Sequence, residues 1–115
     1  MNIEGKVWGT TSELLKKNNV KVNRAVINGG YQCSKHQHYY THNMFFVESG
    51  FVEIHRWKND YDLVDITMLR PGDSCTVPPG EYHRFVGIDQ ESVLYEMYWI
   101  ELSDDIERKD CGGPI

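Results

Sequence analysis

The sequence has no long apolar segment. No apolar run approaches the roughly 20 residues that a membrane-spanning helix requires. The first residues, MNIEGKVWG, lack the apolar centre of a secretory signal peptide. These absences argue against a membrane protein, and we expect a cytoplasmic location.

Positive charge is also scarce. The 115 residues include 12 lysines and arginines against 17 aspartates and glutamates, which gives a net charge of -5 and a pI of about 5.4. A protein that binds nucleic acid needs a basic surface, because its affinity comes largely from neutralising phosphates and releasing their counterions. The acidic balance therefore argues against a nucleic-acid partner.

Cysteine is present only three times, as Cys33, Cys75 and Cys111. The number is odd, and the spacings fit neither a disulfide framework nor a CxxC metal site. We therefore expect reduced thiols without a structural role in cross-linking.

The remaining pattern is typical of a single β-domain spanning residues 1–115. Hydrophobic residues make up 40% of the chain, which is enough for one compact core. Glycine, proline and asparagine interrupt the sequence at intervals that suit short strands, and segments such as 20–27, 63–69 and 92–99 are rich in β-branched or aromatic residues. Half a dozen or more such strands indicate a sandwich or a barrel.

Two segments have helical features. Residues 10–17, TTSELLKK, contain a capping-box pattern, but the Asn-Asn that follows is equally suited to a hairpin, and we favour a strand. Residues 103–110, SDDIERKD, are expected to form one helical turn.

Histidines stand out in the stretch CSKHQHYYTHN. Gly30 is followed after five intervening residues by His36 and, after one more intervening residue, by His38. Residues i and i+2 of a strand face the same side, so the two imidazoles are expected to point together. A second stretch has Gly72, then Pro78 and Gly80, and ends at His83, with two residues between Gly80 and His83.

These two patterns, G-x5-HxH and G-x5-PxG-x2-H, resemble the two motifs of the cupin superfamily, and Gly50 matches the glycine that closes the first motif. The resemblance implies an all-β fold, the double-stranded β-helix or cupin jelly-roll barrel, with a site in its mouth. The segments KVWG, NRAVINGGYQCSKHQH, FFVESG, VPPGEYHRF and DDIERKD resemble more specifically the cupin domain of type II mannose-6-phosphate isomerases. Because cupins commonly pair through sheet edges, we also expect a homodimer.

The resemblance implies that His36, His38 and His83 bind a metal, but the glutamate of the family's shell is missing. The family spacing places Asn43 or His42 at that position, and on a regular strand only one of these neighbours faces the metal. Register favours Asn43, whereas ligand chemistry favours His42, which we assign as the fourth ligand. Without a carboxylate, the set favours Zn, Fe, Ni, Co or Mn over Mg and Ca. The alternative is a metal-free barrel with hydrogen-bonded histidines.

Other polar residues lie near the motifs. Glu96 and Tyr98 are two residues apart on one predicted strand, and Glu96 becomes a candidate general base if that face points inward. A sugar phosphate needs cations for its phosphate and polar groups for its hydroxyls. The candidates for substrate binding are Arg24, Lys35, Tyr40, Arg84 and Tyr98, with surface charge as the alternative for the cations.

Three functions follow as hypotheses. The first is a metal-dependent isomerase or epimerase that acts on a sugar or sugar phosphate. The second is a three-histidine iron dioxygenase, and the third is a non-catalytic module that binds a sugar or another small anion. The fold alone does not choose among them.

Overall fold

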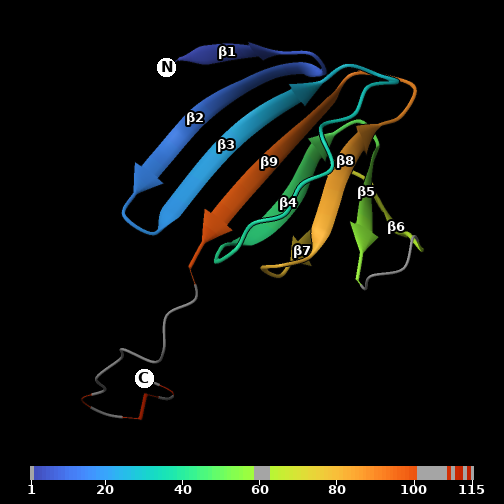
Figure 1. Ribbon diagram of the computed structural model, residues 1–115. Helices are drawn as coiled ribbons and strands as arrows, with labels where there is room; N and C mark the ends of the chain where they lie inside the picture. The colour runs from blue at the N-terminus through green and yellow to red at the C-terminus, as the bar shows by residue number, and fades with distance from the viewer. Residues whose placement is uncertain (1, 59–62, 101–108, 110, 113, 115) are drawn as a thin grey trace.

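A computed structural model describes residues 2–58, 63–100, 109, 111–112 and 114 of the chain. These residues form β-strands and no α-helix, so none has the length and apolarity to cross a membrane as a helix. The strands are β1 (Ile3–Lys6), β2 (Gly9–Lys17), β3 (Val20–Ile27), β4 (His42–Ser49), β5 (Val52–Trp57), β6 (Asp65–Leu69), β7 (Ser74–Val77), β8 (Tyr82–Gly87) and β9 (Ser92–Trp99) (Figure 1).

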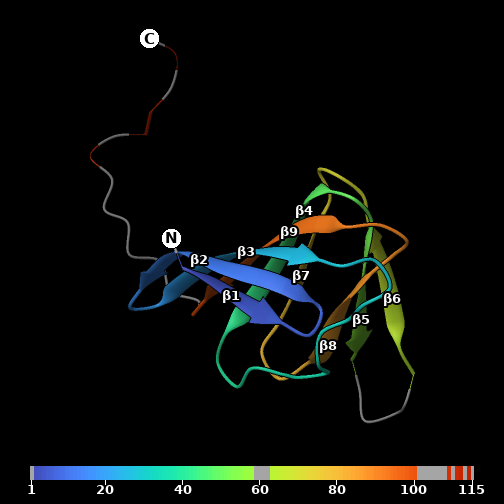
Figure 2. The ribbon, with the colours of Figure 1, turned by 90° about the horizontal axis from the view of Figure 1, so that it is seen from above.

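The strands form two antiparallel sheets. The larger sheet has the order β1-β2-β3-β9-β4-β7, and the smaller has the order β6-β5-β8. In Figures 1 and 2, β1, β2 and β3 extend to one side of the molecule, and the smaller sheet lies on the other. Strands adjacent in a sheet are often distant in sequence, as for β3 beside β9 and β9 beside β4, which is the crossing pattern of a jelly roll. The predicted all-β jelly-roll fold is confirmed.

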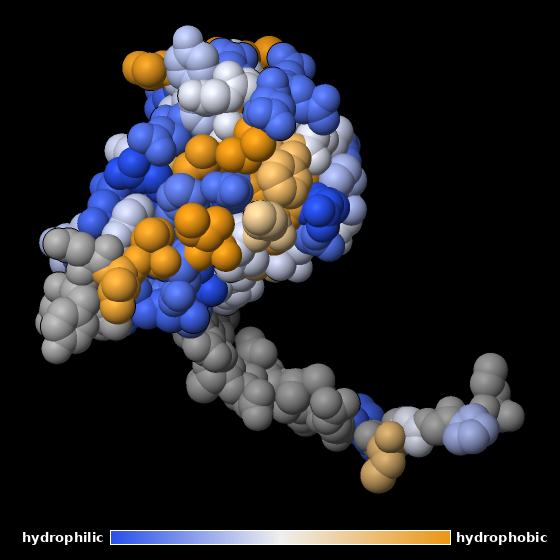
Figure 3. Space-filling model, turned by 90° about the vertical axis from the view of Figure 1, so that its right-hand side faces the viewer, coloured by the Kyte–Doolittle hydropathy of each residue, from blue (hydrophilic) through white to orange (hydrophobic). Residues whose placement is uncertain are grey.

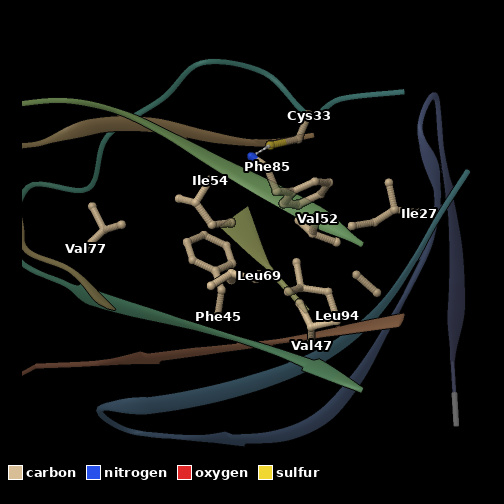
Figure 4. Close-up of a cluster of buried hydrophobic side chains, with 11 residues drawn as sticks. Ile27, Cys33, Phe45, Val47, Val52, Ile54, Leu69, Val77, Phe85 and Leu94 are labelled. Carbon is tan, nitrogen blue, oxygen red and sulfur yellow. Dashed lines mark hydrogen bonds between the residues drawn. The ribbon is translucent and has the colours of Figure 1, made fainter. Parts of the chain in front are cut away.

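The core lies between the two sheets, where alternate residues of each strand point inward. On β4, for example, Phe45 and Val47 are buried whereas their neighbours are more exposed. Phe45 and Phe85 meet edge to face at the centre of this core (Figure 4), with ring centroids 6.5 Å apart. The cluster comprises Ala25, Ile27, Cys33, Phe45, Val47, Val52, Ile54, Leu69, Val77, Phe85 and Leu94.

Residues 10–17 belong to β2, as we favoured over a helix. β2 pairs with β3 along its whole length, with an irregularity between Glu13 and Leu15. Pairing with a neighbouring strand therefore outweighs the local capping signal. The helical turn predicted for residues 103–110 lies outside the described residues, apart from Lys109.

The turn between β4 and β5 requires a glycine. Gly50 has φ of +84°, and a Cβ atom there would approach the Ser92 Oγ atom to 2.2 Å. The same Ser92 hydroxyl accepts a hydrogen bond from the Phe51 N–H at 3.0 Å. The turn, which closes the first motif, is thus fixed by close contact with β9.

The smaller sheet ends at the edge strand β6. This strand and the residues before it expose Leu63, Val64, Ile66 and Met68. Figure 3 views the molecule from the right-hand side of Figure 1, where β5 and β6 lie, and shows apolar side chains gathered among charged ones. An edge strand with exposed apolar residues is a common site for association with another chain.

Candidate metal centre and adjoining cavities

Three histidines converge at one end of the barrel. His83 lies on the inner face of β8 and is 1% exposed. His36 forms an isolated bridge to it, with reciprocal backbone hydrogen bonds of 3.1 and 2.8 Å. The His38 carbonyl accepts a hydrogen bond from the Gly80 N–H at 2.8 Å, which ties the first motif to the second. One ligand atom from each of the three imidazoles lies within 4.8 Å of the others.

The orientation of two imidazoles is fixed by the backbone. The Nδ1 atom of His36 lies 2.7 Å from the Ser34 carbonyl oxygen, and that of His83 lies 2.9 Å from the Glu81 carbonyl oxygen. A carbonyl can only accept, so each Nδ1 carries the proton and each Nε2 keeps a free lone pair. This arrangement is the one that metal-binding histidines adopt.

The remaining nitrogens fit a metal ion. The Nε2 atoms of His38 and His83 are both buried and have no hydrogen-bond partner in the part of the chain that the structure describes. A buried polar atom without a partner is costly, and a bound cation would remove that cost. The three residues therefore fit the metal that the sequence implied.

Burial favours the neutral form of His38 and His83, which is the form that binds metal. Burial, with smaller contributions from the nearby His36 and His38, lowers the pKa of His83 to about 4, although the hydrogen bond to the Glu81 carbonyl works in the opposite direction. Burial and the neighbouring His36 also lower the pKa of His38. Metal binding therefore needs no proton release from these two residues near neutral pH.

The structure does not bring His42 into this group. His42 lies on the outer face of β4, where its ring stacks on Trp99 with centroids 5.5 Å apart and an interplanar angle of 13°. Asn43 points the other way and is fully buried. Because Phe45 and Val47 pack into the core, strand alternation places Asn43 on the inner face of β4 and the predicted fourth ligand His42 on the outer face, away from the three histidines.

The buried side chain of Asn43 is hydrogen-bonded through its nitrogen atom. Its Nδ2 atom donates to the Met97 carbonyl oxygen at 3.3 Å, whereas its Oδ1 atom is buried and has no hydrogen-bond partner among the described residues. Across the sheet, Asn43 lies opposite Tyr98, whose ring is 5.3 Å from that of His38. The amide thus lies on the inner wall next to the residues that surround the histidines.

A cavity of about 750 Å³ opens beside the metal centre. Its walls come from the β1–β2 hairpin, from β3, from β9 and from the segment that leads to His36. The lining residues that matter for chemistry are Lys6, Lys21, His36, Glu96 and Tyr98. The candidate base and the candidate metal centre therefore face the same space.

Glu96 is 6% exposed. Burial raises its pKa to about 7, although a hydrogen bond from Tyr98 and the positive charges of Lys21 and Lys6 work in the opposite direction. Burial and the Glu96 carboxylate in turn raise the pKa of Tyr98, so this phenol remains a hydrogen-bond donor. A buried carboxyl group that titrates near neutrality, in a cavity, is typical of a general acid or base.

A second cavity of about 380 Å³ lies on the other side of Tyr98. It is formed by the β2–β3 turn, the end of β9 and the segment 38–41. Its lining comprises Lys16, Lys17, Asn18, Asn19, Val20, Lys21, His38, Thr41, Tyr98 and Ile100. Lys21 and Tyr98 line both cavities.

Of the residues predicted to bind substrate, only Tyr98 lies at this site. Arg24 is on the outer face of β3, 3.8 Å from the Glu48 carboxylate. Tyr40 is 79% exposed. Lys35 and Arg84 gather around the Trp57 ring, at 4.0 and 5.5 Å from its centroid.

Strand alternation explains why Arg24 and Arg84 lie outside the site. Arg24 follows the inward Asn23, and Arg84 follows the inward His83, so each of these cations points away from the barrel. Arg24, predicted on the strand before the first motif, and Arg84, predicted next to His83, therefore both lie on the face opposite to the histidines.

Sequence reasoning also missed inward-facing charges. Arg56 lies opposite His83 across β5 and β8, and its Nε atom donates to the Glu81 carboxylate. Arg56 continues the inward alternation of Val52 and Ile54, which is a signal that the sequence contained. Lys21 likewise continues the inward alternation of Asn23 and Ala25. Lys16 and Lys17 had no such signal, because the smaller cavity exists only in the folded chain.

Several solved structures have a fold similar to that of this chain. No protein-family model matches the chain, and no curated protein does. Among solved structures, KdgF from Halomonas sp. matches with a TM-score of 0.75 and 14% identity over 89% of this chain and 90% of that one. The Schizosaccharomyces pombe Cnp3 cupin domain matches with a TM-score of 0.75 and 14% identity, over 88% and 69% of the two chains.

CapF from Staphylococcus aureus, a capsular polysaccharide assembling protein, matches with a TM-score of 0.76 and 18% identity over 90% of this chain. The match spans 29% of the CapF chain. At these identities the likeness concerns the fold.

Proposed function

We propose that this cupin-fold chain binds one divalent transition metal through His36, His38 and His83 and acts on a sugar or sugar phosphate as an isomerase or epimerase. The observation that carries the proposal is the cavity shared by His36 and the buried Glu96. A metal site alone would fit many functions, but a carboxyl group with a pKa of about 7 in the same space fits proton transfer. The sequence resemblance to the cupin domain of type II mannose-6-phosphate isomerases points to the same class of reaction.

The ligand atoms limit which metal ions can bind. Three neutral imidazoles suit Zn, Fe, Ni, Co or Mn, and we propose the unpartnered Asn43 oxygen as a further, weaker ligand. When bound, such a cation polarises a carbonyl or hydroxyl oxygen of the substrate and lowers the pKa of adjacent groups.

The chain's own residues supply the proton transfer. Glu96, in its ionised form, accepts a proton from the hydroxyl-bearing carbon next to the carbonyl group, which leaves an enediol. In an isomerase Glu96 returns this proton to the former carbonyl carbon while the hydroxyl proton passes to the former carbonyl oxygen; in an epimerase the proton returns to the same carbon from the opposite face. Tyr98 donates a hydrogen bond to the Glu96 carboxylate and so fixes its position. The enclosing walls keep Glu96 away from bulk water, which maintains its pKa near neutrality.

The name of one structural neighbour supports the class of ligand. CapF is described as a capsular polysaccharide assembling protein, and its structure is known with the inhibitor 3-isopropenyl-tropolone. A tropolone presents two adjacent oxygens, the arrangement that a hydroxy-carbonyl sugar also presents. Tropolone is therefore a useful probe for the metal-loaded protein.

The test has a metal arm and a reaction arm. Elemental analysis of protein purified without a histidine tag should find about one transition metal per chain in the wild type, none in His83→Ala, and an unchanged content in the matched control His42→Ala. A partial loss in Asn43→Ala would support its role as a ligand. Full metal content in His83→Ala would overturn the metal site.

In the reaction arm, metal-loaded protein is incubated in deuterated water with hexoses, pentoses and their phosphates, and deuterium at the carbons next to the carbonyl is followed by NMR. Glu96→Gln should stop the exchange with the metal content unchanged. No exchange with any of these substrates would refute the isomerase proposal, and stabilisation by a sugar without turnover would identify a binding module.

A second function has one observation in its favour. No aspartate or glutamate joins the three histidines in the metal-binding group found among the described residues. A three-histidine set with open positions suits Fe(II) and oxygen chemistry as well as sugar chemistry. Anaerobic loading with Fe(II), followed by measurement of oxygen uptake with diketone or thiol substrates, tests this alternative, and absence of uptake removes it.

A further inference from the structure

A local cluster of positive charge lies next to the metal centre. Lys16, Lys17 and Lys21 come from the β2–β3 hairpin of a chain whose net charge is -5. Lys16 and Lys21 are directly opposite each other across the two strands. Like charges in opposite positions destabilise a sheet, so an anion bound between Lys16 and Lys21 would relieve their repulsion.

The lining of the smaller cavity agrees with this interpretation. The three lysines line it together with Asn18, Asn19 and Thr41, and none of its lining residues is an aspartate or glutamate. The larger cavity differs, because Glu4, Glu13 and Glu96 line it together with lysines. An anionic group would therefore be attracted to the smaller cavity and not to the larger one.

The two cavities are linked through the metal centre. His36 lines the larger cavity and His38 lines the smaller one, and the ligand atoms of both belong to the same three-histidine group. Lys21 and Tyr98 line both spaces. A single extended ligand bound at the histidines can therefore reach Glu96 with one part and the lysines with another.

We propose that the smaller cavity binds the anionic group of the substrate, a phosphate or a carboxylate, while the reacting carbons lie in the larger cavity beside Glu96. This inference rests on the proposed function, because it assigns one end of the same ligand. It also replaces the predicted anion-binding residues Arg24, Lys35 and Arg84, none of which lines the smaller cavity. Lysine ammonium groups bind both phosphate and carboxylate oxygens, so the shared chemistry is that of a small oxyanion.

The experiment measures binding of inorganic phosphate by NMR titration or by thermal stabilisation, in wild type and in the double variant Lys16→Ala/Lys17→Ala. Both lysines are exposed, so their replacement leaves the core intact. Each lost charge-assisted hydrogen bond weakens binding by about tenfold. The matched control is Lys35→Ala with a second exposed charge removed, Lys58→Ala, since these lysines lie outside both cavities.

Loss of phosphate affinity in Lys16→Ala/Lys17→Ala but not in Lys35→Ala/Lys58→Ala supports the proposal. Equal affinity in wild type and Lys16→Ala/Lys17→Ala, or an equal loss in both double variants, overturns it. A second arm compares the binding of a hexose, a hexose 6-phosphate and a hexuronate. Tighter binding of the phosphate or of the acid than of the hexose identifies which oxyanion the site prefers. Loss of this preference in Lys16→Ala/Lys17→Ala supports the proposal.

Phosphate binding measured with and without the metal distinguishes this inference from the proposed function. Chelator-treated wild type should still bind phosphate, because the lysines do not depend on the metal. Phosphate binding that disappears with the metal would mean that the ion itself binds the anion, and this result overturns the lysine site. Phosphate binding without any isomerase activity leaves the lysine site supported and refutes only the proposed reaction.

Discussion

Replacement of Glu96 by glutamine should change how the stability of the protein depends on pH. The pKa of Glu96 rises from 4.5 in the unfolded chain to about 7 in the folded protein, mainly through burial. Between these values the folded protein holds a proton that the unfolded chain releases. The stabilising contribution is therefore fully present below pH 4.5 and is lost as the pH rises through 7.

The size of the effect follows from the two pKa values. At about 1.4 kcal/mol for each tenfold change in the equilibrium constant, the free energy of unfolding loses about 3 kcal/mol between pH 4 and pH 8 because Glu96 must ionise inside the protein. Glutamine carries no charge and can still accept the hydrogen bond from Tyr98. The stability of Glu96→Gln relative to wild type should therefore increase by about 3 kcal/mol over this range.

The assay is urea unfolding of metal-free protein, in the presence of a chelator, at several pH values from 4 to 8. Exposed Glu91 provides the control, because Glu91→Gln should follow the wild-type pH dependence. Titration of His83 contributes equally to all three proteins and cancels in the comparison. If the curves of wild type and Glu96→Gln run parallel, Glu96 does not have a raised pKa, and its proposed role as a base near neutrality loses its support.

Three further predictions concern the fold and its surface. Gly50→Ala should destabilise the protein by about 1–3 kcal/mol or prevent folding, because of the positive φ and the contact with Ser92, and thermal unfolding measures this. Cys33 should react with a thiol reagent far more slowly than exposed Cys111 in the folded protein, since burial raises the Cys33 pKa to about 12; equal labelling by mass spectrometry would contradict this. A homodimer remains predicted from the exposed edge strand β6, and light scattering that gives a mass near 13.4 kDa at micromolar concentration would exclude it.

The fold could be predicted largely from the sequence, for two physical reasons. The side chains of a strand alternate with a period of two, so hydrophobic patterns such as that of residues 20–27 mark strands directly. Tight turns require particular residues, so the glycines and prolines of the two motifs mark the ends of strands. The association of His36 with His83 was implied by the resemblance to the two cupin motifs, and the structure brings these residues together.

The sequence by itself thus determined the strands and the three histidines of the candidate metal centre. The sequence did not determine which of the neighbours His42 and Asn43 faces inward. Alternation gives a strand two opposite faces but does not say which face the core occupies. The packing of Phe45 and Val47 against the second sheet decides this. Likewise, the lysines of the β2–β3 hairpin meet His38 only because β9 and the segment 38–41 close a cavity around them. Contacts between segments so far apart in the chain depend on the pairing of whole strands, and only the tertiary structure decides that pairing.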